Sequence, residues 1–551
     1  MSLTRARPAA AAAVGILLAL GSALSQAQQG LRFPAGNEPA AAPADDAAGG
    51  TQAELPPLGS RLTRPQSGLR IEPSIDAIAT LTNNAAAGSF TGGRDKALIL
   101  ELRPRISFAG QSTRIRAAGS FGLQMLGYLK SEETSRIYPE GKLDANITVV
   151  ERWIYVDTGV GASHASGDAF SLQSGDTPAA DGRVTYRYRL SPYVHRELSP
   201  SLLLSARSDN YWTRLRADDS RGLLAEKSDA QQNTASLELR PEPLGGSVEA
   251  FDEQAKTDAV NATSLGSRGA RLVVNYALTP ELQIGGSVGH ERSEINKVEQ
   301  SDPTHGWRLR WAPSERARFE AQAEHRYFGW GGSGLASVRS PFMVASVEAL
   351  RMPIMQSSPL VNVGAGQGLS AALDAILLTR YPDAAQRETL VRNLISQNGL
   401  SENVTGAVSV FPDYAQLLSR VTGSLVFLGR LTTLELRAYG EQSTILLRTD
   451  PSLLSPITTL LDNRQRGVSI AATRRLTQQL STRLDLGLRE IRGLNDAAGQ
   501  LSREGTLTAS ARLRMGPRSE VGAGLRYRKF RSNVIPGSDT TAVFVGASHR
   551  F

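Results

Sequence analysis

Cysteine is absent from all 551 residues of the sequence, which excludes disulfide-stapled folds, thiolate metal sites and cysteine nucleophiles. Long apolar stretches are also scarce. Apolar residues make up 40% of the chain, and a mean hydropathy of −0.23 excludes a bundle of transmembrane helices. Lysine supplies only seven of the 61 basic residues, so arginine carries nearly all the positive charge. Arginine is always charged and is suited to bidentate contacts.

Two fold classes fit this composition: a multidomain β-rich soluble protein and an outer-membrane β-barrel. A barrel can be hydrophilic on average because half of its strand residues face a polar lumen. The net charge of +8 is modest for the length of the chain and predicts no nucleic-acid partner.

The first 27 residues have the three parts of a secretory signal. Arg5 and Arg7 form a basic region, residues 9–24 are apolar, and residues 25–27 form a small-x-small cleavage site. An N-terminal transmembrane anchor is the alternative, but the apolar run is shorter than the roughly 20 residues that a spanning helix needs. We therefore expect an exported protein.

Residues 28–67 are rich in Ala, Pro, Gly and Gln and show no sustained period, which predicts a disordered periplasmic segment. From residue 68 to the end, the chain breaks into segments with period-two alternation. In residues 503–515, for example, the odd positions beyond Arg503 are small or apolar and the even positions are charged or hydroxylated. Such alternation predicts strands with one apolar and one wet face.

The connections distinguish a barrel from a β-sandwich, which would alternate in the same way. Tight turns, such as residues 312–315 and 516–518, alternate with longer polar loops, such as residues 166–180 and 449–463. Short turns on one rim and long loops on the other are typical of transmembrane barrels, with the short turns in the periplasm.

We predict an all-β, antiparallel outer-membrane barrel of 22 strands over residues 68–551. The weakest boundaries are the turn at Glu151-Arg152 and the break at Ser340-Pro341, and 20 strands is the alternative if these fail. The expected strands are residues 69–83, 97–109, 112–128, 141–150, 153–164, 182–196, 201–215, 231–240, 246–257, 267–278, 281–293, 305–312, 316–329, 333–339, 342–350, 416–428, 431–447, 465–476, 479–491, 503–515, 519–531 and 539–551.

Aromatic residues near segment ends predict interfacial girdles. They are Tyr128, Trp153, Tyr155, Tyr193, Tyr211, Trp212, Trp307, Trp311, Trp330 and Tyr527. The chain also ends on an alternating segment whose last residue is Phe551. This ending resembles the C-terminal assembly signal of outer-membrane barrels, which implies that the barrel-assembly machinery is a partner.

Residues 352–413 depart from the strand pattern and carry two helical signals. The first has Leu369, Ala372, Leu373, Ile376 and Leu377 on one face, and the second runs from Asp383 to Gly399. Strand parity places this insertion on the extracellular side. We expect a helical pair that lies over the barrel mouth, folds into the lumen, or decorates a surface loop.

Three segments resemble a known family. They are residues 71–84, which include Ile71-Glu72-Pro73-Ser74-Ile75, residues 150–157 (Val-Glu-Arg-Trp-Ile-Tyr-Val-Asp) and residues 190–194 (Leu-Ser-Pro-Tyr-Val). They are similar to the outer-membrane β-barrels associated with exosortase (PEP-CTERM) and exopolysaccharide gene clusters. The resemblance implies a Gram-negative outer-membrane component linked to exopolysaccharide export or protein sorting, with periplasmic export components or an anionic polysaccharide as partners.

No catalytic constellation accompanies the six histidines, since G-x-S-x-G, HExxH and Walker sequences are missing. His290-Glu291 and Glu324-His325 place acid beside base, but adjacent strand residues point to opposite faces. We therefore predict no enzyme, no catalytic residues, no cofactor and no metal.

The arginines are the candidate functional residues. A ring of guanidinium groups would favour anionic solutes, whereas pairing with acids such as Glu101, Glu320, Glu324, Asp485, Glu504 and Glu520 would only stiffen the wall. The predicted lumen-lining residues are Arg103, Arg105, Arg187, Arg189, Arg308, Arg310, Arg316, Arg318, Arg512, Arg514, Arg526 and Arg528. The function that we expect is polysaccharide export or related envelope assembly. The alternatives are a general or anion-selective porin and a closed scaffold that binds a partner through its loops.

Overall fold

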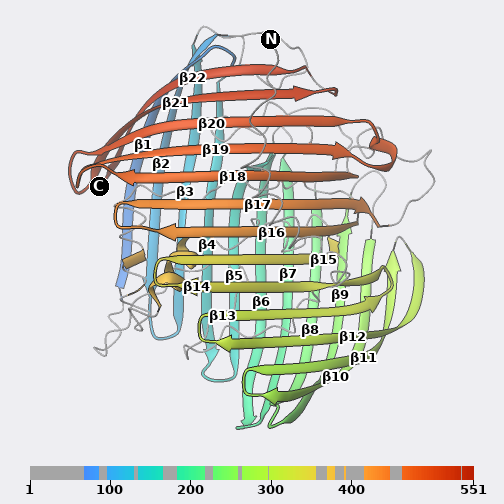
Figure 1. The fold of residues 1–551 in the computed structure, drawn as a ribbon. Coiled ribbons are helices and arrows are strands. Elements are labelled where there is room, and N and C mark those ends of the chain that lie inside the picture. Colours follow the sequence, from blue (N-terminus) through green and yellow to red (C-terminus); the bar gives the residue numbers. More distant parts are fainter. Residues whose placement is uncertain are drawn as a thin grey trace.

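The computed structural model describes residues 68–85, 96–129, 135–165, 183–216, 227–258, 264–295, 297–354, 369–378, 387, 390–391, 415–446, 462–534 and 536–551. The expected signal, the lead-in at residues 28–67 and most of the longer expected loops lie outside this part of the chain. In the described residues, one antiparallel sheet of 22 strands forms the architecture together with α2 (Leu369–Leu377), the helical residues 387 and 390–391, and a short 3-10 turn, Asn495–Ala497 (Figure 1).

The strands of the first half follow each other around the wall. They are β1 (Gly68–Thr82), β2 (Ala97–Gln111), β3 (Ile115–Leu129), β4 (Arg136–Val150), β5 (Ile154–Ala165), β6 (Arg183–Ser199), β7 (Leu202–Arg216), β8 (Lys227–Leu239), β9 (Leu244–Thr257), β10 (Ser264–Thr279) and β11 (Leu282–Ile295).

The second half continues in the same direction. Its strands are β12 (Val298–Ser314), β13 (Ala317–Arg326), β14 (Gly329–Ser340), β15 (Met343–Ile354), β16 (Gln416–Leu428), β17 (Thr432–Ile445), β18 (Asn463–Arg475), β19 (Leu480–Gly493), β20 (Leu501–Arg514), β21 (Ser519–Ser532) and β22 (Ser538–Arg550).

The sheet closes on itself because β1 pairs with β22, from Ser74 opposite Arg550 to Thr82 opposite Ala542. In addition, the Phe551 amide donates a hydrogen bond of 3.0 Å to the Pro73 carbonyl. Closure satisfies the backbone groups that the edges of an open sheet would expose. The front strands in Figure 1 cross those of the far wall, which is the tilt that a closed barrel requires.

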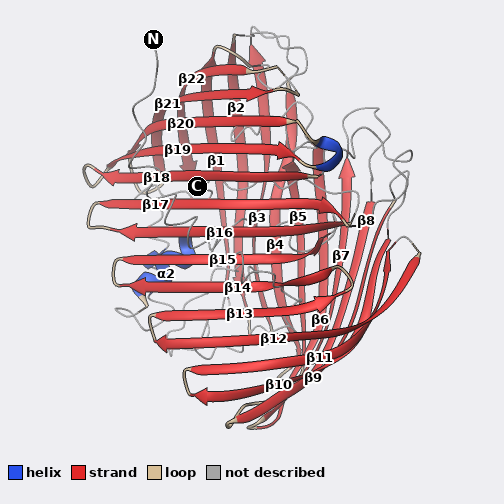
Figure 2. Ribbon diagram, turned by 45° about the vertical axis from the view of Figure 1, so that its right-hand side comes forward, coloured by secondary structure: helices blue, strands red, loops and turns tan. Residues whose placement is uncertain are grey.

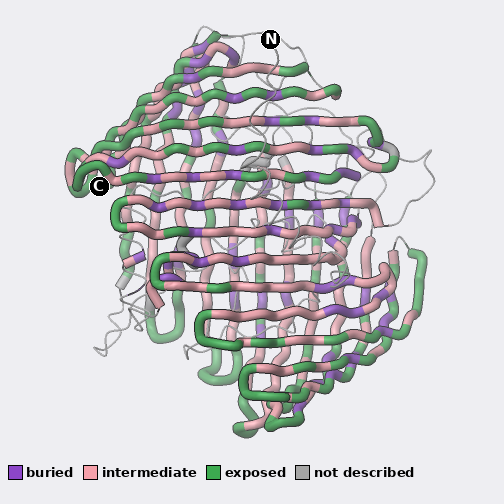
Figure 3. Tube along the Cα trace, in the orientation of Figure 1, coloured by how far each residue is buried: buried purple, intermediate pink, exposed green. Residues whose placement is uncertain are grey.

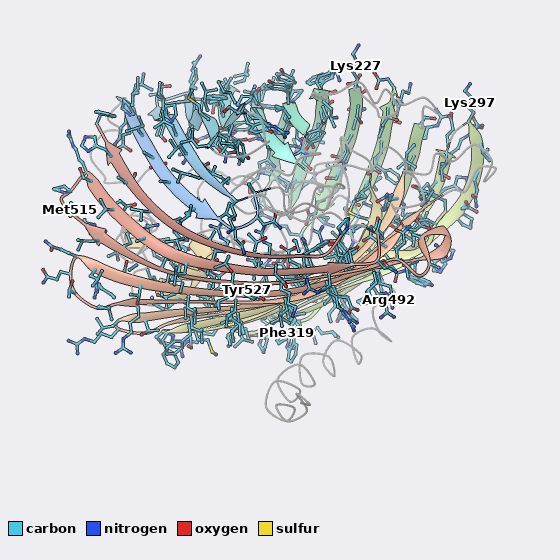
Figure 4. All side chains as sticks on the ribbon, turned by 90° about the horizontal axis from the view of Figure 1, so that it is seen from above. Lys227, Lys297, Phe319, Arg492, Met515 and Tyr527 are labelled. Atoms are coloured by element: carbon cyan, nitrogen blue, oxygen red, sulfur yellow. The ribbon has the colours of Figure 1, made fainter. Side chains whose placement is uncertain are left out.

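Strand count and parity are confirmed, so the alternative of 20 strands is not needed. Arg152, with a φ of 62°, turns the chain between β4 and β5, and the break at Ser340 separates β14 from β15. Each connection at this end of the barrel has at most four residues. We call this the turn end and the opposite end the loop end. Figure 4 shows Met515 at the turn end and Arg492 at the other end of the same strands.

Two expected loops at the loop end are wrong. The sequence pattern predicts a connection over residues 294–304, but β11 and β12 continue until only residues 296–297 separate them. Similarly, β13 and β14 are joined by Tyr327 and Phe328 alone. Polar outward residues such as Glu299 and Ser301 hid the continuation of β12, because they lie beyond the apolar band and resemble loop sequence. Met352 and Pro353, expected in the helical insertion, belong to β15.

Burial alternates along the strands (Figure 3). Large apolar side chains such as Leu69, Val288 and Leu488 are exposed on the outer face, whereas the inward positions carry polar and charged residues. This is the reverse of a soluble protein, whose exposed apolar patches are small, and it matches a lipid-facing band around a polar lumen. The chain is an outer-membrane β-barrel. No helix in the described residues is long and apolar enough to span a membrane.

Candidate functional site: the inner wall and helix α2

The predicted lumen-lining arginines lie on inward positions of their strands, with one exception. Arg316 lies in the turn between β12 and β13, so it belongs to no strand of the wall. Sequence alternation misplaced it because the outward apolar residues of β13 begin only at Ala317, and a turn residue has no fixed face.

Many of the inward arginines contact carboxylates. The pairs are Arg103–Glu101 (2.5 Å), Arg105–Glu140 (2.6 Å), Arg189–Asp144 (3.1 Å), Arg308–Glu249 (3.1 Å), Arg310–Glu320 (3.6 Å), Arg318–Glu320 (2.5 Å), Arg512–Glu520 (3.6 Å) and Arg528–Glu504 (3.2 Å). Arg526 stacks over the Phe544 ring at 5.4 Å. Arg187 is half-buried, and Arg514 lies near the turn end. The pairing favours a wall that is polar but largely charge-balanced.

The most buried charges gather on β9 to β13. Arg271 contacts Glu249 at 2.5 Å and Glu324 at 3.1 Å, and Arg326 is paired with Glu291. The side chains of both arginines are 4% exposed, and that of Glu291 is fully buried. These charged groups are desolvated, so the favourable energy of each one depends on its ion-pair partner.

An aromatic ring links the two arginines of this network. The Phe251 ring centroid lies 5.4 Å from the Arg271 guanidinium carbon and 5.1 Å from that of Arg326. Sequence reasoning missed this network apart from Glu324 and Arg308. The alternation places each residue on the inner face, but only the register of four successive strand pairs brings them together.

A second inward network corrects the predicted aromatic girdle. Tyr193 and Tyr155 stack at 5.1 Å on the inner face, and Arg207 lies over Tyr193 while contacting Asp157 at 2.9 Å. The girdle prediction is wrong for the tyrosines that share the inward parity, which are Tyr128, Tyr155, Tyr193 and Tyr211. By contrast, Trp153, Trp307, Trp311 and Tyr527 are exposed.

The histidine motifs do not form catalytic dyads. Glu291 and Glu324 point inward and are buried, whereas the neighbouring His290 and His325 lie on the outer face. His290 contacts Ser301 at 2.8 Å, and His325 stacks on His305 with ring centroids 5.3 Å apart. Each glutamate and its neighbouring histidine therefore point to opposite faces of the sheet, as the sequence predicts.

Helix α2 confirms the first helical signal of the insertion. Ala372, Leu373 and Ile376 are buried against Val344 of β15 and Val426 of β16. Both valines are inward and lie at the turn end of their strands. Figure 2 shows α2 near the end of the barrel where β14 turns into β15. The insertion, however, leaves β15 at Ile354, at the loop end. Helix α2 therefore lies at the opposite end of the barrel from the end of β15.

Further contacts hold α2 in place. Arg387 donates a hydrogen bond of 2.7 Å from Nε to Asp374 of the helix, and Val391 joins the same apolar cluster. Arg387 and Val391 have helical backbone, but most of the second predicted helix lies outside the described residues. The side chains of α2 and its neighbours thus form one apolar cluster on the inner wall. A second inward cluster, of Ala97, Ile99, Leu126 and Tyr138, lies on β2 to β4.

No family model matches the chain, and no curated protein matches it. Solved structures with a similar fold include the siderophore receptor PirA from Pseudomonas aeruginosa, with a TM-score of 0.44, 10% identity, and 88% of this chain and 81% of that chain covered. The FrpB iron transporter from Neisseria meningitidis gives a TM-score of 0.48 and 8% identity, with 87% and 82% covered. The barrel fold of this chain is shown by its own strand register and by the pairing of β1 with β22.

Proposed function

We propose that the protein is a non-enzymatic outer-membrane conduit whose lumen is narrowed by α2, and that it serves exopolysaccharide export or exosortase-associated envelope assembly. The observation that carries the conduit is the docking of α2 on the inner wall at the turn end. A barrel with a polar lumen that is occupied by one of its own segments is a common arrangement in transporters. The proposed link to exopolysaccharide export rests on the resemblance of residues 71–84, 150–157 and 190–194 to the exosortase-associated barrels.

The paired wall suits a polar chain better than a free anion. Arg189 and Arg308 each contact a carboxylate, so their field is partly neutralised at the surface that a solute would meet. Such a wall offers hydrogen-bond donors and acceptors at close spacing without a strong net attraction. A hydroxyl-rich or acidic glycan can slide along it, because each contact that breaks is replaced by an equivalent one.

Planar-bilayer conductance of the full chain tests the conduit. We expect small or absent currents for the wild type and larger ones for Leu373→Asp with Ile376→Asp, because two buried charges would detach α2 from Val344 and Val426. The matched control is Leu373→Met with Ile376→Leu, which keeps the apolar contacts and volume. Its currents should equal those of the wild type.

The alternatives give different currents. A wild type that is already open and prefers anions would identify an anion-selective porin. Silence in the wild type and in the aspartate variant would identify a closed scaffold. The pathway is tested separately by deleting the gene and measuring surface exopolysaccharide, which should fall and should recover with the wild-type chain. Unchanged polysaccharide would reject the pathway and leave the conduit intact.

A further inference from the structure

The outer surface of β18 to β21 carries a dense group of cations at the loop end. We call it the outer basic patch, and it consists of Arg464, Arg466, Arg492, Arg503, Lys529 and Arg531. All six are exposed and occupy outward positions, with Arg464 opposite Arg492 and Arg503 opposite Arg531 in the strand register. They are independent of the inner wall, whose charges sit on the alternate residues.

The patch begins where the apolar band ends. On β19 the outward residues from Leu480 to Leu488 are apolar apart from Thr482, and Glu490 and Arg492 follow directly. Nine tilted strand residues rise by about 20 Å, close to the height of the apolar band of such barrels. On β21, Tyr527 is followed by Lys529 at the next outward position. With the loop end outside, as the short turns and long connections predict, the patch lies at the level of the outer-leaflet headgroups. Tyr527 and Arg492 lie on the same wall in Figure 4.

Positive charge exceeds negative charge within the patch. One carboxylate, Glu490, is shared by three arginines, at 2.7 Å from Arg466, 2.8 Å from Arg503 and 3.7 Å from Arg492. Arg464 donates to Gln442, which is neutral, at 2.7 Å, and Arg531 contacts Asp539 at 2.9 Å. Glu490 orients several guanidinium groups side by side while neutralising only one of them.

The neighbouring wall shows that this is a local feature. At the loop ends of β1, β3 and β4, the outward residues remain apolar up to the last two residues of the strand. Leu81, Leu129 and Ile137 are each about half exposed or more. A barrel that only needed to meet the headgroup layer would have no reason to concentrate six cations on four adjacent strands. The concentration points to a defined anionic ligand.

We propose that the outer basic patch binds the phosphorylated headgroup of an outer-leaflet lipid. Guanidinium groups bind phosphate oxygens bidentately, and the row held by Glu490 presents several at the spacing of one strand to the next. The acyl chains of such a lipid would lie on Leu488 and Leu525, directly below the patch. Tyr527 would contact the boundary between headgroup and chains, where tyrosine is favoured.

Lipid binding to the purified full chain in detergent tests the proposal. The probes are a lipid A with two phosphates and the same lipid after enzymatic removal of both phosphates. The variant is Arg466→Gln, Arg503→Gln and Lys529→Gln together. We expect the affinity for the bisphosphorylated lipid to fall by about fivefold per basic residue removed, hence roughly a hundredfold, and dephosphorylated lipid to bind wild type and variant equally weakly.

The matched control removes outward loop-end arginines elsewhere. Arg268 and Arg292 face each other on β10 and β11, and changing both to Gln should leave lipid affinity within twofold of the wild type. A heat-modifiable band in electrophoresis verifies that each variant is folded. Arg466→Lys with Arg503→Lys keeps the charges but loses the bidentate contacts, so its affinity should lie between those of the wild type and the glutamine variant.

Three results would overturn the proposal. The first is equal affinity of the glutamine variant and the wild type for bisphosphorylated lipid A. The second is an undiminished affinity of the wild type for the dephosphorylated lipid. The third is displacement of the lipid by an equal concentration of inorganic phosphate or of an acidic polysaccharide, which would identify a site for a soluble anion.

Discussion

Val344 and Val426 are register partners on β15 and β16, and their buried side chains support Leu373 of α2 from inside the barrel. This contact links the fold to the proposed function. The wall supplies two β-branched residues at the turn end, and the buried face of α2 covers them. Val344 and Val426 face the lumen rather than lipid, and they form the surface on which α2 packs.

Truncating the centre of this contact should loosen α2 without unfolding the barrel. Leu373 is fully buried, so Leu373→Ala should cost the docked helix about 2–4 kcal/mol through lost contacts and a cavity. Hydrogen exchange over residues 369–377 should accelerate, while exchange in β15 and β16 should not. Leu377→Ala is the control, because Leu377 is only partly buried, and its effect should be smaller.

The lipid-facing assignment predicts opposite outcomes for two adjacent residues of β20. Leu507 points outward and Thr508 inward. Leu507→Arg places a charge in the hydrocarbon layer and should lower the free energy of unfolding by roughly 2–4 kcal/mol. Thr508→Arg meets the lumen and should cost under about 1 kcal/mol. Urea unfolding in liposomes measures both, and equal losses would contradict the assigned faces.

The buried network on β9 to β13 should behave as a unit. Arg326→Met leaves Glu291 charged and buried without its partner, which should destabilise the barrel by about 3–5 kcal/mol. Adding Glu291→Leu removes that charge and should restore part of the loss. The measurement is a double-mutant cycle in urea. Additive single effects would show that the two side chains do not interact.

Much of the barrel could be predicted because its two faces contrast so strongly. Leu484, Leu486 and Leu488 alternate with Arg483 and Asp485, and that contrast identifies the strand and both of its faces. The prediction was wrong where the contrast ends. Beyond the membrane both faces are polar, so the continuation of β12 over residues 298–304 looked like a loop.

The site was less predictable because it depends on distances between strands. Alternation places Tyr193 on a face but does not say which face an aromatic residue prefers near the rim, and Tyr193 is buried inside against Arg207. The position of α2 also required the structure. Its apolar face shows that it must pack on something, whereas Val344 and Val426 became candidates only once β15 and β16 were paired.

The C-terminal residue should matter more for assembly than for final stability. Phe551 is 63% exposed, and its backbone amide bonds to Pro73 next to the closing pair of strands. Phe551→Ala keeps that hydrogen bond but removes the ring that the assembly machinery is expected to recognise. Pulse-chase electrophoresis should show slower appearance of the heat-modifiable folded band in cells. In detergent refolding, where no machinery acts, wild type and variant should fold alike.

The absence of cysteine makes the orientation of the barrel directly measurable, because a single introduced thiol is the only reactive one. Lys297 lies at the loop end between β11 and β12, and Gly516 lies at the turn end between β20 and β21. With the loop end outside, Lys297→Cys should react with a membrane-impermeant maleimide in intact cells. Gly516→Cys should react only after the outer membrane is permeabilised. The reverse labelling pattern would show that the loop end faces the periplasm, and the outer basic patch would then lie at the periplasmic leaflet.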